Sequence, residues 1–356
     1  MTSNGDVFTS STGRAGTVLA LDGGNSKTDA AVVTVHGEVL ARVRGAGFRP
    51  HLGRAEALAG LHQVTRSALQ EAGLSRVTLL SACLANSDLP QEDVEYGKWF
   101  SAEGFADEVT VTNDVFALLR SGTRARAAVT VVCGAGMNCV GVAPGREPLR
   151  FLALGTFTGD WGGGGTLSDQ AMFWAMRAED GRSGPTVLSR AIPDHFGVSC
   201  THQVAEALHL GAIDWHRTHE LVPLLFRVAA AGDAVALSVV HRQADEVIAF
   251  AMAALRRLDL LDTETEVVLG GGVLAAKEPV LLGPIVTALA EQAPRARVTI
   301  PQIQPIVGAV LLGLEHLTAG VAVSLELEQA VRIAFGETAV DDTALPGAVP
   351  LIVDAS

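Results

Sequence analysis

The sequence TVLALDGGNSKTDAAVV, residues 17–33, decides the fold class of this chain. An apolar run at residues 17–21 leads into the glycine-containing segment Asp22–Thr28, and residues 29–35 form a second β-branched run without helical spacing. Two such runs joined by glycine and asparagine are typical of a β-hairpin, because these residues accept the backbone angles of a tight turn. After another turn, residues 39–43 resume the apolar pattern. We therefore predict three consecutive antiparallel strands.

Helices and strands follow this meander in alternation. Residues 54–72 place alanine, leucine and valine at helical spacing and end at Gly73, a common helix stop. Residues 77–84 and 109–112 are short apolar runs typical of buried strands, and a helix is expected after each. The resulting order, βββαβαβα, predicts an α/β unit over residues 17–121.

A second unit begins in the same way. Residues 128–132 and 137–142 flank the glycine turn 133–136, and residues 151–154 are predicted as a third strand. The repeated pattern indicates a duplicated half. Further helices are predicted at 167–178, 199–208, 235–258, 277–292 and 305–317, and further strands at 266–269 and 297–300. Residues 325–334 could add one more helix.

These patterns divide the chain as follows. Residues 1–16 are polar, lack an apolar core, and are expected to form a disordered leader rather than a signal peptide. The N-terminal unit, 17–121, is expected to be completed by a helix at 305–318, and the C-terminal unit to cover 122–304. Residues 319–356 are expected to be a C-terminal tail.

The composition excludes several classes of protein. Lys and Arg number 26 against 39 Asp and Glu, a net charge of −13, so the backbone of a nucleic acid has little to attract it. Although 48% of the residues are hydrophobic, no apolar run reaches the roughly 18–20 residues that cross a membrane. The cysteines, at 83, 133, 139 and 200, form no CxxC pair, which argues against zinc, iron–sulfur and disulfide frameworks. We expect a soluble, cytoplasmic protein that binds neither nucleic acid nor membrane.

Three glycine-containing turns are candidate phosphate-binding sites. The first, Asp22–Thr28, offers backbone N–H groups, two hydroxyls and a lysine, which suit a phosphate chain. It lacks the Walker and Rossmann patterns, and an ordinary hairpin turn is the alternative. The second turn, 134–138, and the third, 270–272, add similar surfaces, which favours phosphates held by the two hairpins and adenosine by the third turn. The predicted ATP-binding residues are Gly23, Gly24, Asn25, Ser26, Lys27, Thr28, Gly134, Ala135, Gly136, Gly271 and Gly272.

Six strings carry a resemblance to a known family. In chain order they are LALDGGNSKTDAAVV, VTNDVFALL, VVCGAGMNCVGV, GDWGGGGTLSDQAM, VVLGGGV and PIVGAVLLGL. Over residues 17–318 the chain resembles the BadF/BadG/BcrA/BcrD ATPase family, and within it the N-acetylglucosamine kinases of the actin-like, hexokinase and Hsp70 superfamily. The resemblance implies an α/β fold of two ribonuclease H-like lobes, with ATP, a metal and a sugar in the interlobe cleft.

The resemblance makes Asp114 the catalytic base toward the sugar hydroxyl. Asp114 follows the apolar run 109–112 and opens a predicted helix, where a carboxylate can project into a cleft. The local alternative is a helix N-cap, because Asn113-Asp114 before an apolar helix suits capping. Phosphoryl transfer needs positioning and charge neutralisation more than strong basicity, so an ionised aspartate suffices.

The other site roles also come from the resemblance. Asn138 and Asp160 match positions that hydrogen-bond sugar hydroxyls, and a turn residue is the alternative for each. Asp22 is assigned to Mg²⁺ through its waters, because this ion favours carboxylates and keeps water ligands; an aspartate that only stabilises the hairpin is the alternative. Two substrate-binding candidates depart from the family. Arg49 stands where an asparagine is usual and could meet an anionic group, and Trp161 stands where a glutamate is usual and could stack on a sugar or fill a gap.

The function expected from these residues is ATP-dependent phosphorylation of a hydroxyl of a hexose or amino sugar. ATP and Mg²⁺ are the expected cofactors, a small-molecule sugar the expected partner, and a homodimer the expected assembly. One alternative is a non-catalytic sugar-sensing relative, given the altered Arg49 and Trp161. Another is the activating ATPase of a radical dehydratase, but that branch carries a cysteine-ligated iron–sulfur cluster that the cysteines here do not suggest.

Overall fold

The structure is a computed structural model that describes residues 16–301 and 304–337. The described residues divide into two compact units, residues 16–121 with 304–337 (unit 1) and residues 122–301 (unit 2). The predicted leader lies outside the described residues except for Gly16, and so does the predicted tail beyond Glu337.

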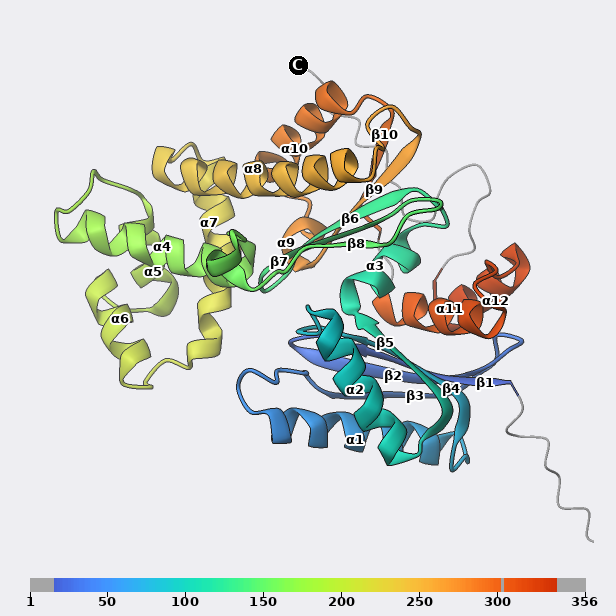
Figure 1. Cartoon of the computed structure of the whole chain (residues 1–356). Helices are drawn as coiled ribbons and strands as arrows, with labels where there is room; N and C mark the ends of the chain where they lie inside the picture. The colour runs from blue at the N-terminus through green and yellow to red at the C-terminus, as the bar shows by residue number, and fades with distance from the viewer. Residues whose placement is uncertain (1–15, 302–303, 338–356) are drawn as a thin grey trace, which may run out of the picture. The chain divides into compact units, whose positions relative to one another are not determined.

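Unit 1 is built on a five-stranded mixed sheet (Figure 1). In spatial order its strands are β3 (Val39–Ala46), β2 (Lys27–Thr34), β1 (Thr17–Gly23), β4 (Val77–Leu84) and β5 (Ala106–Asn113). The first three strands along the chain pair antiparallel, as predicted, and β4 lies parallel between β1 and β5.

Helices cover both faces of this sheet (Figure 1). They are α1 (Arg54–Glu71) and α2 (Pro90–Glu103) on one face, α11 (Pro305–Leu317) and α12 (Leu325–Ala334) on the other, and α3 (Asp114–Gly122) directly after β5. Successive residues of a strand point to opposite faces. Leu19 and Leu21 of β1 accordingly pack under α1 and α2, while Val18 and Ala20 pack under α11. Burial on both faces explains why β1 reads as an unbroken apolar run.

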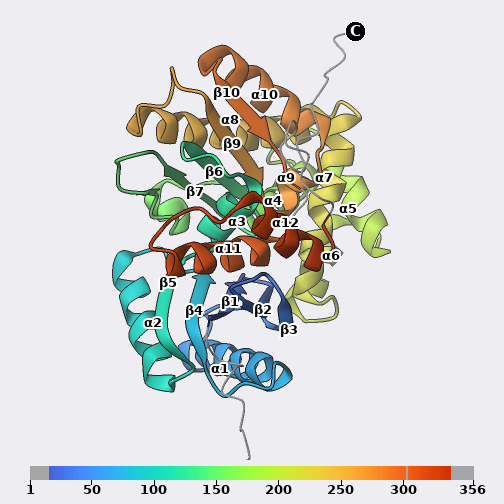
Figure 2. The ribbon, with the colours of Figure 1, turned by 90° about the vertical axis from the view of Figure 1, so that its right-hand side faces the viewer.

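Unit 2 repeats the strand order of unit 1 (Figure 2). Its strands in spatial order are β10 (Ala296–Thr299), β9 (Thr265–Gly270), β6 (Ala128–Cys133), β7 (Met137–Val142) and β8 (Leu149–Arg150). The predicted duplication is thereby confirmed. The predicted third strand at 151–154 is wrong, because β8 ends at Arg150. Ala153 takes a left-handed conformation with φ of 54°, and a 3₁₀ turn, η1 (Gly155–Thr158), follows, so the chain leaves the sheet.

The remaining elements of unit 2 are mostly helices. They are α4 (Gly163–Glu179), α5 (Leu188–Phe196), α6 (Thr201–His209), η2 (Trp215–Glu220), α7 (Leu221–Ala230), α8 (Ala234–Arg257), α9 (Gly272–Ala275) and α10 (Pro279–Gln292). Helix α5 was not predicted, because Pro193 interrupts its pattern, and α7 was not predicted either. In the described part of the chain no single helix is long and apolar enough to span a membrane. Only the pair 215–230 and 234–257 meets that test jointly, across a bend of 112°.

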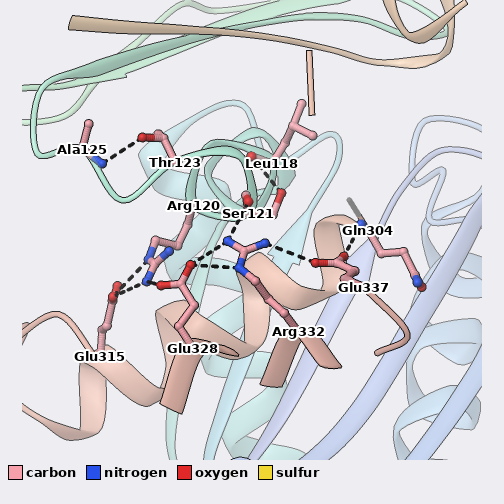
Figure 3. Close-up of polar contacts among 10 residues, drawn as sticks. All are labelled: Leu118, Arg120, Ser121, Thr123, Ala125, Gln304, Glu315, Glu328, Arg332 and Glu337. Atoms are coloured by element: carbon pink, nitrogen blue, oxygen red, sulfur yellow. Dashed lines mark hydrogen bonds and ion pairs between the residues drawn. The ribbon is translucent and has the colours of Figure 1, made fainter. Parts of the chain in front are cut away.

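Buried ion pairs fasten α12 into unit 1 (Figure 3). Arg120 of α3 donates from Nη2 to Glu315 of α11 at 2.9 Å and to Glu328 of α12 at 2.6 Å. Arg332 donates to the other oxygen of Glu328, also at 2.6 Å, and its Nη1 lies 3.2 Å from Glu337. The side chains of Glu328 and Arg332 are 0% and 1% exposed. Burial alone would raise the pKa of Glu328, but the hydrogen bond from Arg120 and the charges of both arginines hold that pKa below its usual value.

The same ion-pair network also binds backbone atoms of both chain segments of unit 1. These atoms lie where the first segment ends, after α3, and where the second begins, before α11. Arg332 Nη2 donates to the carbonyl oxygen of Ser121 at 2.9 Å, at the end of α3. The backbone N–H of Gln304, just before α11, donates to Glu337 at 3.0 Å. A carbonyl at a helix C-terminus lacks an intrahelical partner, and a cation there is favourable. Helix α12 is therefore an integral part of unit 1.

Candidate functional site

Three parallel strands of unit 1 end at one edge of the sheet, and the site is built there. Gly23 at the end of β1 pairs with Leu84 of β4, and Leu84 pairs with Asn113 of β5. Asp22 therefore stands at the end of one outer strand of this trio, and Asp114 follows the end of the other. The carboxyl edge of such strands is where α/β folds bind ligands.

Asn113 holds the start of α3. Its Oδ1 accepts the backbone N–H of Val115 at 3.1 Å, while its Nδ2 donates to the carbonyl of Ser87 at 3.2 Å and to Asp88 at 2.9 Å. This capping role belongs to Asn113, the residue before the predicted base. The Asp114 carboxyl group also accepts hydrogen bonds from N–H groups at the start of α3, so the catalytic role of Asp114 stays a prediction beside its local alternative, a helix cap.

Asp114 has a carboxyl group whose pKa is raised above the ordinary value for aspartate. Burial raises the pKa of its carboxyl group to about 6, and hydrogen bonding from the backbone N–H groups of Val115 and Asp114 itself limits the rise. A carboxyl group with that pKa is largely ionised at neutral pH and is still basic enough to accept a proton.

Asp22 is the more strongly perturbed carboxyl group. It is 7% exposed, and burial is the main reason why its pKa rises to about 8. The negative charges of Asp114 and Asp29 raise the pKa further, and the charge of Lys27 opposes them. A cation bound here would reduce the repulsion between these negative carboxyl groups.

The donor set fits Mg²⁺ better than a metal held by protein ligands alone. In the ranges 16–301 and 304–337 the structure contains no group of three or more His, Cys, Asp or Glu side chains able to hold a metal. Mg²⁺ is usually bound by one or two carboxylates together with waters and substrate phosphates. Asp22 supplies such a carboxylate at the strand edge.

The tip of the β1–β2 hairpin, residues 24–26, is flanked by charged contacts. Lys27 Nζ lies 2.5 Å from Asp29, and Arg44 Nε lies 2.6 Å from the other oxygen of Asp29. Although burial opposes the shift, hydrogen bonds from Arg44 and Lys27 hold the pKa of Asp29 below its usual value. The Thr28 hydroxyl donates to the carbonyl of Ala46 at 2.8 Å and so ties β2 to β3. Contact of Lys27 and Thr28 with phosphate stays a prediction.

The predicted ATP-binding residues of unit 2 gather within that unit. The N–H groups of Gly164 and Gly165, at the start of α4, donate to the carbonyls of Gly134 and Ala135 at 2.7 and 3.0 Å. Gly271 has a φ of 86°, and a Cβ there would lie 2.4 Å from the carbonyl oxygen of Cys133. The second and third glycine turns are thus in contact, and only glycine fits at 271.

The sugar-binding candidates are divided between the units. Asn138 lies inside strand β7, so its alternative as a turn residue is wrong. Asp160 follows η1 and accepts a hydrogen bond from the Thr158 hydroxyl. Trp161 is buried with the Arg242 guanidinium 4.1 Å from its ring centre, which favours the gap-filling alternative. Arg49 is exposed on the loop between β3 and α1 in unit 1.

The cysteines are not reactive groups of this site. Cys83, Cys133 and Cys139 are fully buried free thiols, and burial raises the pKa of each, to about 12 for Cys133. Sequence reasoning missed Asn86, which follows β4 and contacts the hairpin tip. Its asparagine type at a strand end was the only available signal, and its partners are 61 and 38 residues away.

Comparisons with known proteins agree with this architecture. The model of a family described as the BadF/BadG/BcrA/BcrD ATPase family matches residues 19–313. The N-acetyl-D-glucosamine kinase of Dictyostelium discoideum is 24% identical over 311 residues, which cover 83% of this chain and 97% of that protein. The N-acetylmuramic acid/N-acetylglucosamine kinase of Clostridium acetobutylicum is 22% identical over 260 residues, covering 72% of this chain and 85% of that one.

A solved structure shares the fold. The structure of a proposed N-acetylglucosamine kinase from Chromobacterium violaceum superposes with a TM-score of 0.65 at 22% identity, covering 83% of this chain and 98% of that chain. The predicted α/β fold of two ribonuclease H-like lobes is confirmed by this likeness and by the repeated strand order.

Proposed function

The chain belongs to the BadF/BadG/BcrA/BcrD ATPase family, and from this premise we propose that it transfers the γ-phosphoryl group of ATP to a hydroxyl of a hexose or amino sugar. ATP use accompanies membership of an ATPase family. Two curated relatives are named as kinases of N-acetylated amino sugars, and both support a sugar as the acceptor.

One observation carries the proposal: a carboxyl group with a pKa of about 6 opens α3 at the carboxyl edge of the sheet. In the proposed reaction the sugar hydroxyl oxygen forms a bond to the γ-phosphorus, and the bond between that phosphorus and the β–γ bridging oxygen breaks. ADP leaves with the electron pair of the broken bond. Asp114 takes the hydroxyl proton, and charge neutralisation and positioning account for most of the rate.

We assign Mg²⁺ to Asp22, acting through water ligands. When bound, the ion neutralises charge on the phosphates. The raised pKa of Asp22 supports this assignment, because a carboxylate that is costly to ionise alone becomes ionised readily beside a divalent cation. The hairpin tip and the glycine turns of unit 2 are proposed to hold the phosphates and the adenosine. Closure of the two units around one nucleotide stays a prediction.

The sugar is proposed only as a class. Asn138 and Asp160 offer a hydrogen-bonding amide and a carboxylate, which together suit sugar hydroxyls. Arg49 supplies a positive charge that a neutral sugar does not need. A substrate that carries an acidic group, such as an amino sugar with a carboxylate, would use that charge.

The experiment is an ADP-release assay of purified protein with Mg²⁺ and ATP. The acceptors are glucose, glucosamine, N-acetylglucosamine, N-acetylmannosamine and N-acetylmuramic acid, each compared with a reaction that contains no acceptor. We expect ADP release above the background with at least one sugar, and none when EDTA replaces Mg²⁺. If no sugar stimulates ADP release while sugars still bind, the proposal fails and a sensing role replaces it.

The proposal extends to the cellular setting. We propose that the protein acts in the cytoplasm, where ATP and sugars are available, because its cysteines are free thiols. We further propose that it assembles as a homodimer, which sedimentation at several protein concentrations can test.

A further inference from the structure

Asn86 connects two loops that sequence analysis treats as separate. It lies two residues beyond β4, the strand between β1 and β5. Its Nδ2 donates to the Asn25 side-chain oxygen at 3.0 Å and to the carbonyl oxygen of Phe48 at 3.0 Å. Asn25 lies in the hairpin tip, and Phe48 lies in the Arg49 loop, which we define as residues 47–53.

Asn86 makes these two hydrogen bonds from an uncommon backbone conformation. Its φ of 57° places it in the left-handed region, which asparagine tolerates better than most residues. An amide nitrogen carries two hydrogens, and two acceptors are in place, so both donors are committed. The side chain is therefore fixed between its two partners.

The two loops already touch through their backbones. The N–H of Phe48 donates to the carbonyl oxygen of Gly24 at 2.9 Å. A Cβ at Gly47 would lie only 2.1 Å from the carbonyl oxygen of Asn25, so the close approach requires glycine at 47. The Phe48 ring is buried and packs edge-on against the Tyr96 ring of α2, with 5.3 Å between the two ring centroids. Arg49 therefore directly follows a residue that contacts both the hairpin tip and α2.

The junction also continues toward Asp114. Ser87, the neighbour of Asn86, offers its carbonyl oxygen to Asn113 Nδ2 at 3.2 Å. Asn113 caps α3 and directly precedes Asp114. One short segment, residues 86–87, therefore contacts the hairpin tip, the Arg49 loop and the residue before the candidate base.

We infer that Asn86 is a positioning residue that couples the hairpin tip to the Arg49 loop, so that nucleotide and sugar each strengthen the binding of the other. The inference rests on the proposed function, in which the tip holds phosphate and the loop meets the sugar. A nucleotide that orders the tip also orders the loop through Asn86 and Phe48. Linkage requires the reverse effect to be equal in size.

Two substitutions distinguish the role of the Asn86 side chain from that of its backbone conformation. Asn86→Gly keeps the left-handed backbone without strain and removes the amide. Asn86→Asp keeps the shape of the side chain but presents oxygens to two acceptors. Ala319→Gly is the matched control, because Ala319 also has a left-handed backbone, with a φ of 56°, and is exposed in the segment after α11.

The measurement is calorimetric binding of the sugar found in the ADP-release assay, with and without saturating non-hydrolysable ATP analogue and Mg²⁺. In the wild type we expect the analogue to tighten sugar binding. Two lost hydrogen bonds at about 0.5–1.5 kcal/mol each correspond to a factor of roughly 5 to 150 in the sugar dissociation constant. In Asn86→Gly and Asn86→Asp the tightening by the analogue should therefore fall toward none. The KM values for ATP and sugar should both rise, and kcat should change less. Ala319→Gly should behave as the wild type.

The outcomes separate the two proposals. If the wild type and Asn86→Gly show the same nucleotide-dependent tightening, or if the wild type shows none while it phosphorylates the sugar, the role of Asn86 is overturned and the kinase function stands. If the wild type neither binds a sugar nor consumes ATP, the proposed function fails. A lower melting temperature with unchanged coupling would show Asn86 to be merely structural and would also overturn the inference.

Discussion

Burial and then the negative charge of Asp114 raise the pKa of Asp22, although β4 lies between the strands that lead to these two aspartates. The carboxyl groups share the carboxyl edge of one sheet, and both have pKa values above the ordinary range for aspartate. Ionising both in the ligand-free protein is costly. A bound cation would lower this cost, in line with the proposed Mg²⁺ site.

Asp22→Asn is expected to raise the melting temperature of the ligand-free protein. The pKa of Asp22 is about 8 in the folded protein against 3.8 for the unperturbed group. The folded state therefore retains a proton that the unfolded state releases, and stability falls as pH rises from about 4 to about 8. The variant lacks this loss, so the gain in melting temperature should be largest at pH 8 and small at pH 4. Calorimetric scans across this range provide the measurement. An equal gain at both pH values would refute the ionisation argument.

The pH profile of catalysis should report Asp114. With a pKa of about 6 for the base, kcat/KM for the sugar should rise with pH up to about 6 and then level off. Below that pH the carboxyl group is protonated and cannot accept the hydroxyl proton. The assay uses saturating ATP and Mg²⁺ between pH 5 and 8. A profile that stays flat down to pH 5 would remove Asp114 from the role of base.

Arg332→Met is expected to destabilise unit 1. The substitution removes the ion pair between Arg332 and the buried carboxylate of Glu328, and a buried pair broken on one side typically costs about 3–5 kcal/mol. The matched control is Arg190→Met, which breaks an exposed pair with Asp194 worth about 0–1 kcal/mol. Urea unfolding measures both. A loss for Arg332→Met no larger than that of the control would show that the buried network adds nothing.

Arg49→Gln should change sugar preference rather than turnover. Arg49 is exposed and directly follows the anchored Phe48. If its charge meets an acidic group, the KM for N-acetylmuramic acid should rise about tenfold or more, while the KM for N-acetylglucosamine should change little; charged hydrogen bonds are worth about 1.5–3 kcal/mol. Parallel rises for both sugars would contradict a charge-specific contact.

Local sequence patterns predicted much of this fold because the elements concerned are locally specified. The β1–β2 hairpin follows from two apolar, β-branched runs joined by a short segment that contains glycine and asparagine, and α1 follows from its apolar spacing. The predicted range of the third strand of unit 2, 151–154, was wrong because Ala153 adopts a left-handed conformation, which the sequence pattern does not indicate for an alanine. A proline inside α5 concealed that helix.

The site was predictable only in part. Asp22 and Asp114 stand at strand ends, a position visible in the pattern, but their raised pKa values depend on burial and mutual charge that only the folded chain provides. Asn86 was missed because its partners are distant in sequence. The role of α12 was missed for the same reason, since Arg120 and Glu328 are 208 residues apart.

The central claim is tested most directly by the turnover of Asp114→Asn with the sugar that stimulates ADP release, beside Asp107→Asn as the control. Asp107 lies near the opposite end of β5 and forms a partly exposed ion pair with Arg76. We expect kcat of Asp114→Asn to fall by about 10²–10⁴ with circular dichroism unchanged, the range typical of a lost general base, and Asp107→Asn to retain wild-type turnover. A folded Asp114→Asn protein that phosphorylates the sugar at the wild-type rate would contradict the account.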